Sequence, residues 1–358
     1  MGIPLPLDHQ EHMSIRIKTV ATATPPHSRT TPAILPLVDA WMHGREEREI
    51  AKAKKIFEGA GVQRRFSIMD PQAVFTAGSF GEKNDLYTVA VTDLSEKVLS
   101  NALSQANWKP SDLDYIITVS CTGFMIPSVD ATLINHLGLR GDVIRLPVTE
   151  MGCAGGVSGL IYAADFLRHN PGKKAAVIAA EAPTATFQLD DFSMANIVSA
   201  ALFGDGAACV LLSSDESETG PEIIDRNMYH FFDSEHMMGF HLTDGGLKMV
   251  LDVEVPDKIE THLAAIIDPF LAGNGLDQAD VSLVFHPGGR KIIMAAQDFF
   301  GDADALDDTR AVLRDFGNLS SATVLFVLAR MMERPTREYG LMLSFGPGFS
   351  AQTILLKW

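Results

Sequence analysis

The sequence predicts an α/β protein in which helices cover both faces of a buried sheet. Short runs rich in Val, Ile, Leu and Ala alternate with longer stretches of helical periodicity, and this alternation is typical of α/β folds. The runs are almost continuously apolar, which indicates strands that are covered on both faces. With 358 residues and 46% hydrophobic side chains, the chain can build a large core.

The expected elements follow from these two patterns in chain order. Helical periodicity predicts helices over Thr31–Trp41, Glu46–Glu58, Leu94–Ala106, Gly155–Arg168, Asp257–Ala272 and Ser320–Met332. Continuous apolar runs predict strands over Tyr115–Cys121, Val143–Pro147, Ala175–Ala180, Ala207–Ser213, Val281–His286, Gly340–Phe345 and Gln352–Lys357.

Two stretches of the chain repeat the same order of elements. A helix rich in small residues begins at Cys153 and leads to a strand around Val177. A similar helix begins at Asn318 and leads to a strand around Met342, at the same distance in sequence. The repeat predicts two similar halves, 1–215 with the cysteine and 216–358 with a histidine and the asparagine. Ordinary α/β alternation with coincidental spacing is the alternative.

Charge and cysteine content exclude several classes of protein. The chain carries 29 Lys and Arg against 45 Asp and Glu, a net charge of −16, so we expect no nucleic-acid partner. No apolar stretch has the length of a membrane span, and the N-terminus lacks the pattern of a signal peptide. The three cysteines, Cys121, Cys153 and Cys209, form neither a disulfide framework nor a zinc motif. We therefore expect a cytoplasmic protein without a metal.

Cys153 is the first candidate for chemistry. It lies in Met151–Gly156, at a predicted turn from strand to helix. Because the N-terminus of a helix favours anions, we expect a lowered thiol pKa and a nucleophilic thiolate. The neighbouring glycines permit a tight turn and the close approach of a substrate. A small buried cysteine packed at a helix start is the structural alternative.

A histidine and an asparagine complete a possible catalytic set. His286 ends an apolar strand and precedes Pro287-Gly288-Gly289, which directs its ring toward the sheet edge where ligands bind. Asn318 begins a helix and could simply cap it, but its amide can also donate to a developing oxyanion. A neutral donor suits a carbanion intermediate, which an acid would quench. Papain-like proteases use the same residue types, but their sequence context differs.

These motifs together resemble the type III polyketide synthases, the chalcone-synthase-like group of the thiolase superfamily. The resemblance runs from about Ile15 to the C-terminus, and the Phe-Gly-Pro-Gly loop near the end is its most specific part. It implies a thiolase-like, five-layered αβαβα fold made of two similar halves. The motifs that carry it are Gly152–Gly156, Leu202–Ala208, His286–Gly289, Gly317–Ala322 and Phe345–Phe349.

The resemblance implies a role for each catalytic candidate. Cys153 would take a starter acyl group from coenzyme A, with His286 helping to keep it a thiolate. His286 and Asn318 would stabilise the enolate formed when malonyl-CoA loses CO2, and this enolate would attack the acyl group on Cys153. The extended polyketide on Cys153 would then cyclise to a pyrone, a resorcinol or a phloroglucinol-type product. Acyl-CoA and malonyl-CoA are the implied substrates, and no cofactor is implied.

The resemblance also implies a gate and a reaction chamber. Phe203 matches an aromatic gate, and Met249 stands where a second gate residue is commonly Phe. Cys121 stands where plant members have Thr, and it is a candidate second thiol, although a small chamber-lining cysteine is the simpler interpretation. The other residues placed at the chamber are Thr186, Ser320, Phe345 and Ile126, the last reaching into a partner's chamber in a homodimer.

Basic side chains are implied at the mouth of a coenzyme A tunnel. Lys52 and Lys55 share one face of a predicted helix and match positions that contact the phosphates in the family. Arg290 follows the glycines after His286 and is a further candidate. Solvated surface charges are the alternative for all three residues.

Two other activities remain open for the same fold. A ketoacyl carrier-protein synthase III would perform a single condensation, but it usually has His-Gln-Ala-Asn where this chain has His286–Gly289, and it lacks the Phe345–Gly348 loop. A non-catalytic acyl-CoA binder could have kept the fold. A degradative thiolase needs a second catalytic cysteine after the histidine, and no cysteine follows Cys209.

Overall fold

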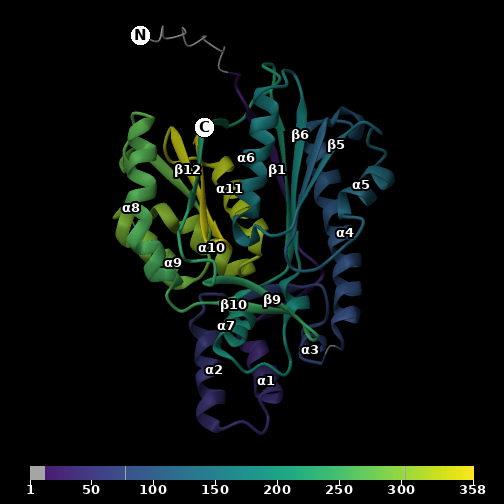
Figure 1. The fold of residues 1–358 in the computed structure, drawn as a ribbon, viewed down its shortest axis with the longest axis vertical. Coiled ribbons are helices and arrows are strands. Elements are labelled where there is room, and N and C mark those ends of the chain that lie inside the picture. Colours follow the sequence, from purple (N-terminus) through teal and green to yellow (C-terminus); the bar gives the residue numbers. More distant parts are fainter. Residues whose placement is uncertain (1–12, 77, 303) are drawn as a thin grey trace.

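The computed structural model describes residues 13–76, 78–302 and 304–358 of the chain. The strands of its large sheet are β1 (Arg16–Ala23), β4 (Tyr115–Val119), β5 (Ile144–Val148), β6 (Lys174–Glu181), β7 (Gly206–Ser213), β8 (Glu222–His230), β11 (Val281–Phe285), β12 (Tyr339–Gly346) and β13 (Ser350–Lys357). Within the described residues these nine strands lie in the order β11-β12-β13-β8-β1-β7-β6-β4-β5 (Figure 1).

The sheet consists of two halves that meet where β1 lies beside β8, at Arg16 and Glu222. In the first half, β4 is parallel to β6, and β6 is antiparallel to β7. In the second half, β11 is parallel to β12, and β12 is antiparallel to β13. The same local topology therefore occurs twice, and the connection between β7 and β8 separates the two halves.

Helices cover both halves of the sheet and fill the space between them (Figure 1). Helices α4 (Phe80–Ala106) and α5 (Val129–Leu137) cover the outer side of the first half, and α8 (Val255–Gly273) and α9 (Arg290–Phe300) cover the outer side of the second. Helices α6 (Gly155–Arg168) and α11 (Thr323–Glu333) lie between the halves, in one apolar core with strands of both. This arrangement gives the five layers that the resemblance implies.

Glycines at the start of α6 allow the two central helices to approach closely. A Cβ atom on Gly156 would lie 2.2 Å from the carbonyl oxygen of Ser321, just before α11. A Cβ atom on Gly159 would lie 2.7 Å from Cγ1 of Val177 in β6. Because only glycine fits at these contacts, Gly156 lets the start of α6 lie close to the start of α11, and Gly159 lets α6 lie close to β6.

A group of smaller elements, here named the cap, lies below the large sheet in Figure 1. Its helices α1 (Thr31–Trp41), α2 (Glu47–Gly59) and α7 (Met194–Leu202) share an apolar core that includes Val38, Phe57 and Ile197. Helix α10 (Asp307–Phe316) packs against both α11 and the cap strand β3. The cap consists of β2 (His27–Thr30), α1 (Thr31–Trp41), α2 (Glu47–Gly59), β3 (Arg64–Ser67), α3 (Pro71–Val74), α7 (Met194–Leu202), β9 (Met238–Thr243) and β10 (Gly246–Leu251).

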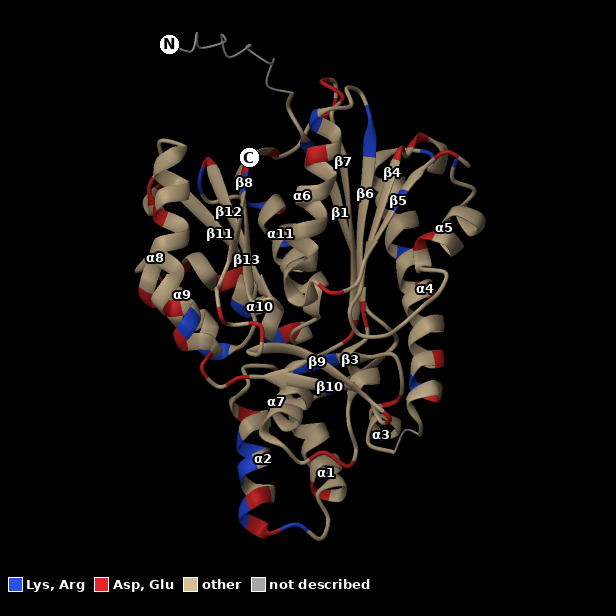
Figure 2. Ribbon diagram, in the orientation of Figure 1, with Lys and Arg blue, Asp and Glu red and all other residues tan. Residues whose placement is uncertain are grey.

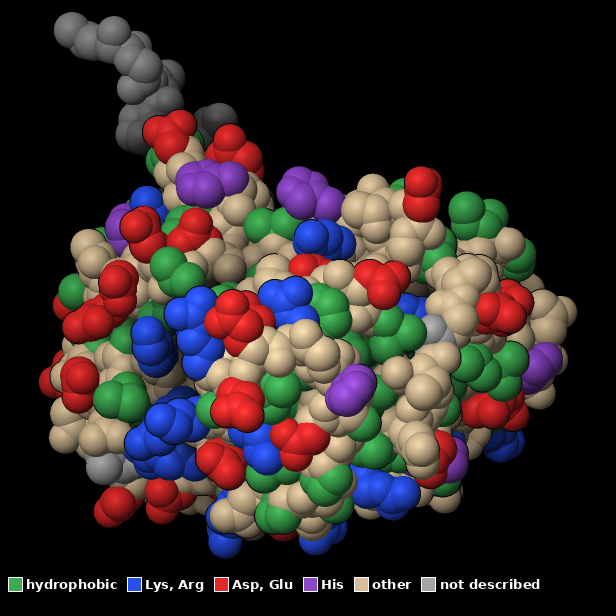
Figure 3. All heavy atoms as spheres, turned by 90° about the horizontal axis from the view of Figure 1, so that it is seen from below, with side chains coloured by type: hydrophobic (Ala, Val, Ile, Leu, Met, Phe, Trp, Pro, Cys, Tyr) green, Lys and Arg blue, Asp and Glu red, His purple; other side chains and the backbone are tan. Residues whose placement is uncertain are grey.

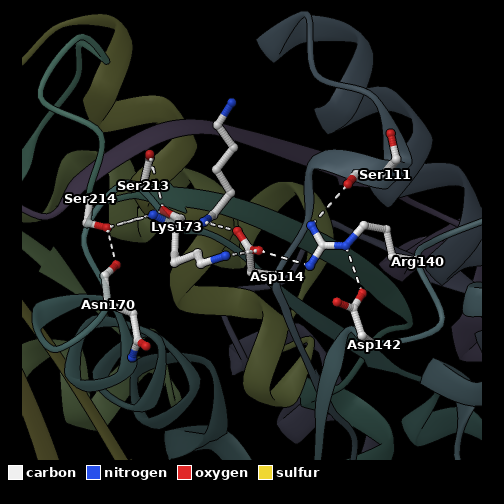
Figure 4. A network of polar contacts seen from close by, with 9 residues as sticks. Ser111, Asp114, Arg140, Asp142, Asn170, Lys173, Ser213 and Ser214 are labelled. Atoms are coloured by element: carbon white, nitrogen blue, oxygen red, sulfur yellow. Dashed lines mark hydrogen bonds and ion pairs between the residues drawn. The ribbon is translucent and has the colours of Figure 1, made fainter.

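A polar network ties together the opposite end of the first half of the sheet (Figure 4). Asp114 accepts hydrogen bonds from Lys173 Nζ at 2.9 Å and from Arg140 Nη2 at 3.1 Å. The Lys173 backbone N–H in turn donates to Ser214 Oγ at 3.1 Å. Burial works to raise the pKa of Asp114, but these donors outweigh it and the pKa is lowered. The network joins the segments before β4, β5 and β6 and after β7.

The observed elements differ from the predicted ones at several places. Helix α4 begins at Phe80 rather than Leu94, because a capping box formed by Ser79 and Glu82 starts it in a polar segment without clear periodicity. Strand β5 was expected to be covered on both faces, but it is an edge strand, and Ile144 is 50% exposed. No helix among the described residues combines the length and apolar character needed to cross a membrane.

Candidate active site

Cys153 and His286 follow the carboxyl ends of strands, where α/β proteins bind ligands, and Asn318 follows helix α10. Cys153 belongs to the short turn η2 (Gly152–Ala154), between β5 and α6. Asn318 precedes the turn η6 (Ser320–Ala322), which leads into α11. His286 directly follows β11, and its backbone N–H donates to the Leu343 carbonyl of β12 at 2.9 Å. The matching turns of the two halves therefore face each other across the centre of the molecule.

The amide of Asn318 is oriented toward the sulfur of Cys153. Asn318 Oδ1 accepts hydrogen bonds from the backbone N–H of Ser320 at 2.8 Å and from Thr323 Oγ1 at 3.0 Å. These contacts occupy the oxygen, so the NH2 group points the other way, and Nδ2 lies 4.0 Å from Cys153 Sγ. Asn318 is 2% exposed. It is thus a fixed, neutral donor beside the thiol rather than a simple helix cap.

His286 has a ring with no hydrogen-bond partner for Nδ1 or Nε2 among the described residues. The side chain is buried, and this burial lowers its pKa to about 3. The ring is therefore neutral at pH 7. Such a ring can donate a hydrogen bond to an oxyanion without delivering its proton to a neighbouring carbanion.

The thiol of Cys153 is governed by burial rather than by the helix start. Burial raises its pKa to about 12, although Ser320 and Asn318 act to lower it. The expectation that the start of the helix lowers the pKa of Cys153 is therefore wrong. A buried thiolate needs a positive charge close by, because desolvation penalises an isolated charge.

A second thiol is joined to Cys153 through one hydroxyl group. Ser320 Oγ lies 3.8 Å from Cys153 Sγ and 3.4 Å from Cys121 Sγ. Cys121 Sγ also lies 3.6 Å from Oε1 of Glu181. Burial and the Glu181 carboxylate raise the pKa of Cys121 well above its ordinary value. Cys121 is thus a neutral thiol that lines the site and contacts the Ser320 hydroxyl and the Glu181 carboxyl group.

Several polar residues that the sequence analysis did not assign surround the Glu181 carboxyl group. It accepts hydrogen bonds from Ser321 Oγ at 2.5 Å, Thr122 Oγ1 at 2.8 Å and Ser120 Oγ at 3.2 Å. Ser120 Oγ itself accepts from the hydroxyl of Tyr87 at 2.7 Å. Ser120 and Thr122, which follow β4, were a signal in the sequence for this polar network. Tyr87 lies within α4, and no sequence pattern marked it.

Another unassigned residue supports the nucleophile from the second half of the molecule. Ser344 of β12 donates from Oγ to the backbone carbonyl oxygen of Cys153 at 2.7 Å. Ser344 is fully buried. The hydrogen bond therefore fixes the turn that carries the thiol to the strand beside His286.

The predicted gate residues meet at a small cavity. Phe203, Thr186 and Met249 line a cavity of about 60 Å³ between the cap and the site. Phe203 also forms a β-bridge with Asn318, which holds the gate position next to the catalytic turn. Phe345 lies elsewhere, in the buried aromatic core, with its ring centroid 6.1 Å from that of Phe285.

The predicted coenzyme A contacts lie on the surface. Lys52 and Lys55 are exposed on α2, and Arg290 is exposed at the start of α9. Figure 2 shows Lys and Arg along α2 in blue, and the view from below in Figure 3 shows several basic side chains close together among scattered acidic ones. Positively charged side chains therefore gather along α2 although the net charge of the chain is −16.

The predicted dimer contact lies on a different surface. Ile126 is 99% exposed, and nearby Phe124 is 48% exposed. Both belong to the loop between β4 and α5. Within its own chain, Ile126 therefore lines no chamber.

Comparison with known proteins gives consistent matches over most of the chain. Residues 64–216 match the family described as "Chalcone and stilbene synthases, N-terminal domain", and residues 226–358 match the corresponding C-terminal domain. A 1,3,6,8-tetrahydroxynaphthalene synthase from Streptomyces peucetius subsp. caesius is 35% identical over 352 residues, 96% of this chain and 93% of that protein.

Further relatives agree with these matches. A 3,5-dihydroxyphenylacetyl-CoA synthase from Streptomyces toyocaensis is 31% identical, over 96% of this chain and 90% of that protein. The crystal structure of 1,3,6,8-tetrahydroxynaphthalene synthase from Streptomyces coelicolor A3(2), described as a bacterial type III polyketide synthase, superimposes with a TM-score of 0.91 at 28% identity. That alignment covers 96% of this chain and 99% of the other.

Proposed function

Because this chain belongs to the chalcone and stilbene synthase family and is a type III polyketide synthase, we propose that it builds a polyhydroxylated aromatic product on Cys153. The observation that carries the proposal is the Asn318 amide beside the Cys153 thiol. The buried, unpaired ring of His286 lies beside β12, the strand that is hydrogen-bonded to the Cys153 turn. The products named for its relatives, tetrahydroxynaphthalene and dihydroxyphenylacetyl-CoA, support the aromatic class. The same relatives and the same donors give less support to a ketoacyl carrier-protein synthase III or to a non-catalytic acyl-CoA binder.

The loading step transfers an acyl group from coenzyme A to Cys153. The thiol proton passes to His286, and the resulting thiolate attacks the thioester carbonyl carbon. A new C–S bond forms, the bond to the coenzyme A sulfur breaks, and the leaving thiolate takes the proton back from His286. Each charge is disfavoured alone in this buried site, so the thiolate and the imidazolium form together.

The extension step uses malonyl-CoA as the source of a carbanion. Loss of CO2 leaves an enolate, whose oxygen accepts hydrogen bonds from the His286 ring and the Asn318 amide. The enolate carbon attacks the acyl carbonyl on Cys153, so that a C–C bond forms and the Cys153 thiolate leaves. The neutral state of His286 suits this step, because an imidazolium would protonate the enolate carbon.

The binding of substrates and of a partner subunit belongs to the same proposal. Lys52, Lys55 and Arg290 bind the phosphates of coenzyme A at the surface. No cofactor is required, because decarboxylation drives each condensation. Ile126 of each subunit reaches toward the chamber of the other in a homodimer, which explains why so large an apolar side chain is 99% exposed in one chain.

Product mass spectrometry tests the proposal. The purified protein is incubated with malonyl-CoA, alone and with acyl-CoA starters of several lengths. We expect products that grow by successive two-carbon ketide units, none of them with Cys153→Ala. Cys209→Ala serves as the matched control, because Cys209 is buried in the core away from the site, and it should retain the products. A single condensation seen only with a malonyl carrier protein would instead favour the ketoacyl synthase, and no product with either donor would favour the binder.

A further inference from the structure

A buried arginine in the cap lacks an acidic partner. Arg65 of β3 is 6% exposed, and burial lowers its pKa to about 10, so it keeps its charge at pH 7. No ion pair to Arg65 is found within the described residues. A buried charge is strongly disfavoured unless it is paired, so this guanidinium calls for an explanation.

The contacts of Arg65 account for only part of its hydrogen-bonding capacity. Nη2 donates to the carbonyl oxygen of Ala201 at 2.8 Å and to Thr31 Oγ1 at 3.3 Å. The guanidinium carbon lies 5.5 Å from the centroid of the Phe57 ring, a modest cation–π contact. Nε and Nη1 are buried without a partner among the described residues. Two nitrogens are therefore left to donate.

A second unpaired polar group borders the same space. The hydroxyl of Ser199 in α7 is buried and also lacks a partner in the described part of the chain. Arg65 and Ser199 both line the cavity of about 60 Å³ that Phe203, Thr186 and Met249 also line, and Phe203 is bridged to Asn318. One cavity thus brings together an unpaired cation, an unpaired hydroxyl and the gate.

We propose that this cavity is a subsite for a carboxylate at the distal end of the acyl chain on Cys153, as left by a malonyl-type starter. A carboxylate neutralises Arg65 and accepts from both Arg65 and Ser199, which a neutral carbonyl does only in part. The cavity has room for a group of a few atoms, not for a whole chain. The inference rests on the proposed function, since it concerns the starter of the same reaction.

A purely structural role for Arg65 makes a different prediction. In that case the guanidinium only ties β3 to the C-terminal end of α7 through the Ala201 carbonyl, and a water molecule occupies the cavity. Its loss would then weaken the protein for every starter alike. The carboxylate-binding role and the structural role of Arg65 therefore predict different starter selectivity for the variant, and not merely a different overall activity.

The experiment compares two starters under the same extension conditions. The product made from malonyl-CoA alone is measured against the product primed with hexanoyl-CoA, in both cases as kcat/KM for the starter. We expect Arg65→Gln to lower malonyl priming at least tenfold relative to hexanoyl priming, because it removes a charged hydrogen-bond donor. Ser199→Ala should shift the same ratio severalfold. Arg64→Gln, which changes the exposed neighbour of Arg65 on β3, should leave the ratio unchanged.

The outcomes separate this inference from the proposed function. Equal losses for both starters in Arg65→Gln, or an unchanged ratio in Ser199→Ala, would overturn the carboxylate subsite in favour of the structural role. A wild-type protein that makes only the hexanoyl-primed product would also overturn it. If Arg65→Gln does not fold, Ser199→Ala still decides, because that hydroxyl has no partner to lose. A wild-type protein that makes neither product would contradict the proposed function itself.

Discussion

The reactive residues of this site owe their resting state to burial. Cys153 and His286 each favour the neutral form, with pKa values moved to about 12 and about 3. A charge on either residue alone would be isolated in a poorly solvated environment, whereas a proton passed from the thiol to the ring creates two opposite charges that stabilise each other. In the mechanism proposed above, thiolate formation at Cys153 therefore depends on His286 more than on the helix start.

This dependence predicts the reactivity of Cys153 toward iodoacetamide. At pH 7, His286→Gln should slow alkylation of Cys153 by about tenfold to a hundredfold, because removing the proton acceptor raises the apparent thiol pKa by about 1–2 units. Mass spectrometry of the peptide that carries Cys153 gives the rate. The control His169→Gln changes an exposed histidine at the end of α6 and should leave the rate unchanged. Equal rates in the wild type and His286→Gln would refute the paired mechanism.

A buried carboxylic acid, Asp205, predicts that the stability of the protein depends on pH. Asp205 is fully buried and accepts hydrogen bonds from the backbone N–H groups of Ile68 at 2.7 Å and Thr184 at 3.0 Å. Burial nevertheless raises its pKa to about 7. The folded state then binds more protons than the unfolded state between about pH 4 and pH 7, where an unfolded Asp has already ionised. The contribution of Asp205 is therefore fully present below about pH 4 and is lost as the pH rises toward 7.

Asp205→Asn removes this titration. Urea unfolding at pH 4.5 and pH 7.5 should show that the wild type loses more stability across the interval than the variant, by on the order of 3 kcal/mol. The comparison of differences cancels any constant cost of the substitution. Parallel pH profiles for the two proteins would show that Asp205 is ionised throughout and that its pKa is not raised.

At the scale of elements, the site depends on how closely two helix starts approach. The turns that carry Cys153 and Asn318 are held together by Gly156, whose Cα faces the Ser321 carbonyl. Ser344 adds a hydrogen bond from β12 to the Cys153 carbonyl. The relative position of the catalytic groups is thus set by backbone contacts between elements from the two halves.

Gly156→Ala should push these elements apart. The added Cβ atom would lie 2.2 Å from a backbone oxygen, which must move, and overpacking of this kind costs about 1–3 kcal/mol of stability. Because a displacement of about 1 Å in an active site can reduce the rate by about a hundredfold, kcat/KM should fall at least tenfold. Gly141→Ala is the control, since no atom lies within 4 Å of a Cβ there. An active Gly156→Ala protein would show that the contact does not position the site.

The sequence predicted the elements whose signal is local. Apolar runs located the central strands, and the helix Gly155–Arg168 agrees with α6 at both ends. The polar first half of α4 escaped prediction, because tertiary packing and a capping box decide it rather than periodicity. Strands β1 and β8 were also missed, because their mixed composition carries no continuous apolar run.

Sequence motifs made the catalytic candidates predictable, whereas the contacts between residues distant in sequence were not predictable. Cys153, His286 and Asn318 each lie in a glycine-containing motif, so the candidate set could be named from the chain. The contacts that join Glu181 to Ser321, or Arg65 to Ala201, connect residues far apart in sequence. Such contacts depend on strand register and helix packing, which no local pattern encodes.

For the molecule as a whole, the association of two copies depends more on where charged and apolar side chains lie on the surface than on how many there are. The net charge of −16 opposes the association of copies at long range, but this repulsion is screened within about 8–10 Å at physiological salt. Short-range apolar contact can then dominate where a large side chain is fully exposed. Ile126 and Phe124, on the loop after β4, provide such a surface.

The homodimer proposal predicts the oligomeric state of the protein and of one variant. Sedimentation velocity at micromolar concentration should show a dimer for the wild type. Ile126→Glu should weaken it at least tenfold, because the interface would bury an unpaired carboxylate. Val253→Glu places the same charge on another apolar side chain, 81% exposed on the opposite half, and should remain dimeric. Activity should fall with dissociation in Ile126→Glu, since each chamber would lose the side chain that its partner supplies. A monomeric wild type, or an Ile126→Glu protein that stays fully dimeric, would place the contact between subunits elsewhere or exclude it.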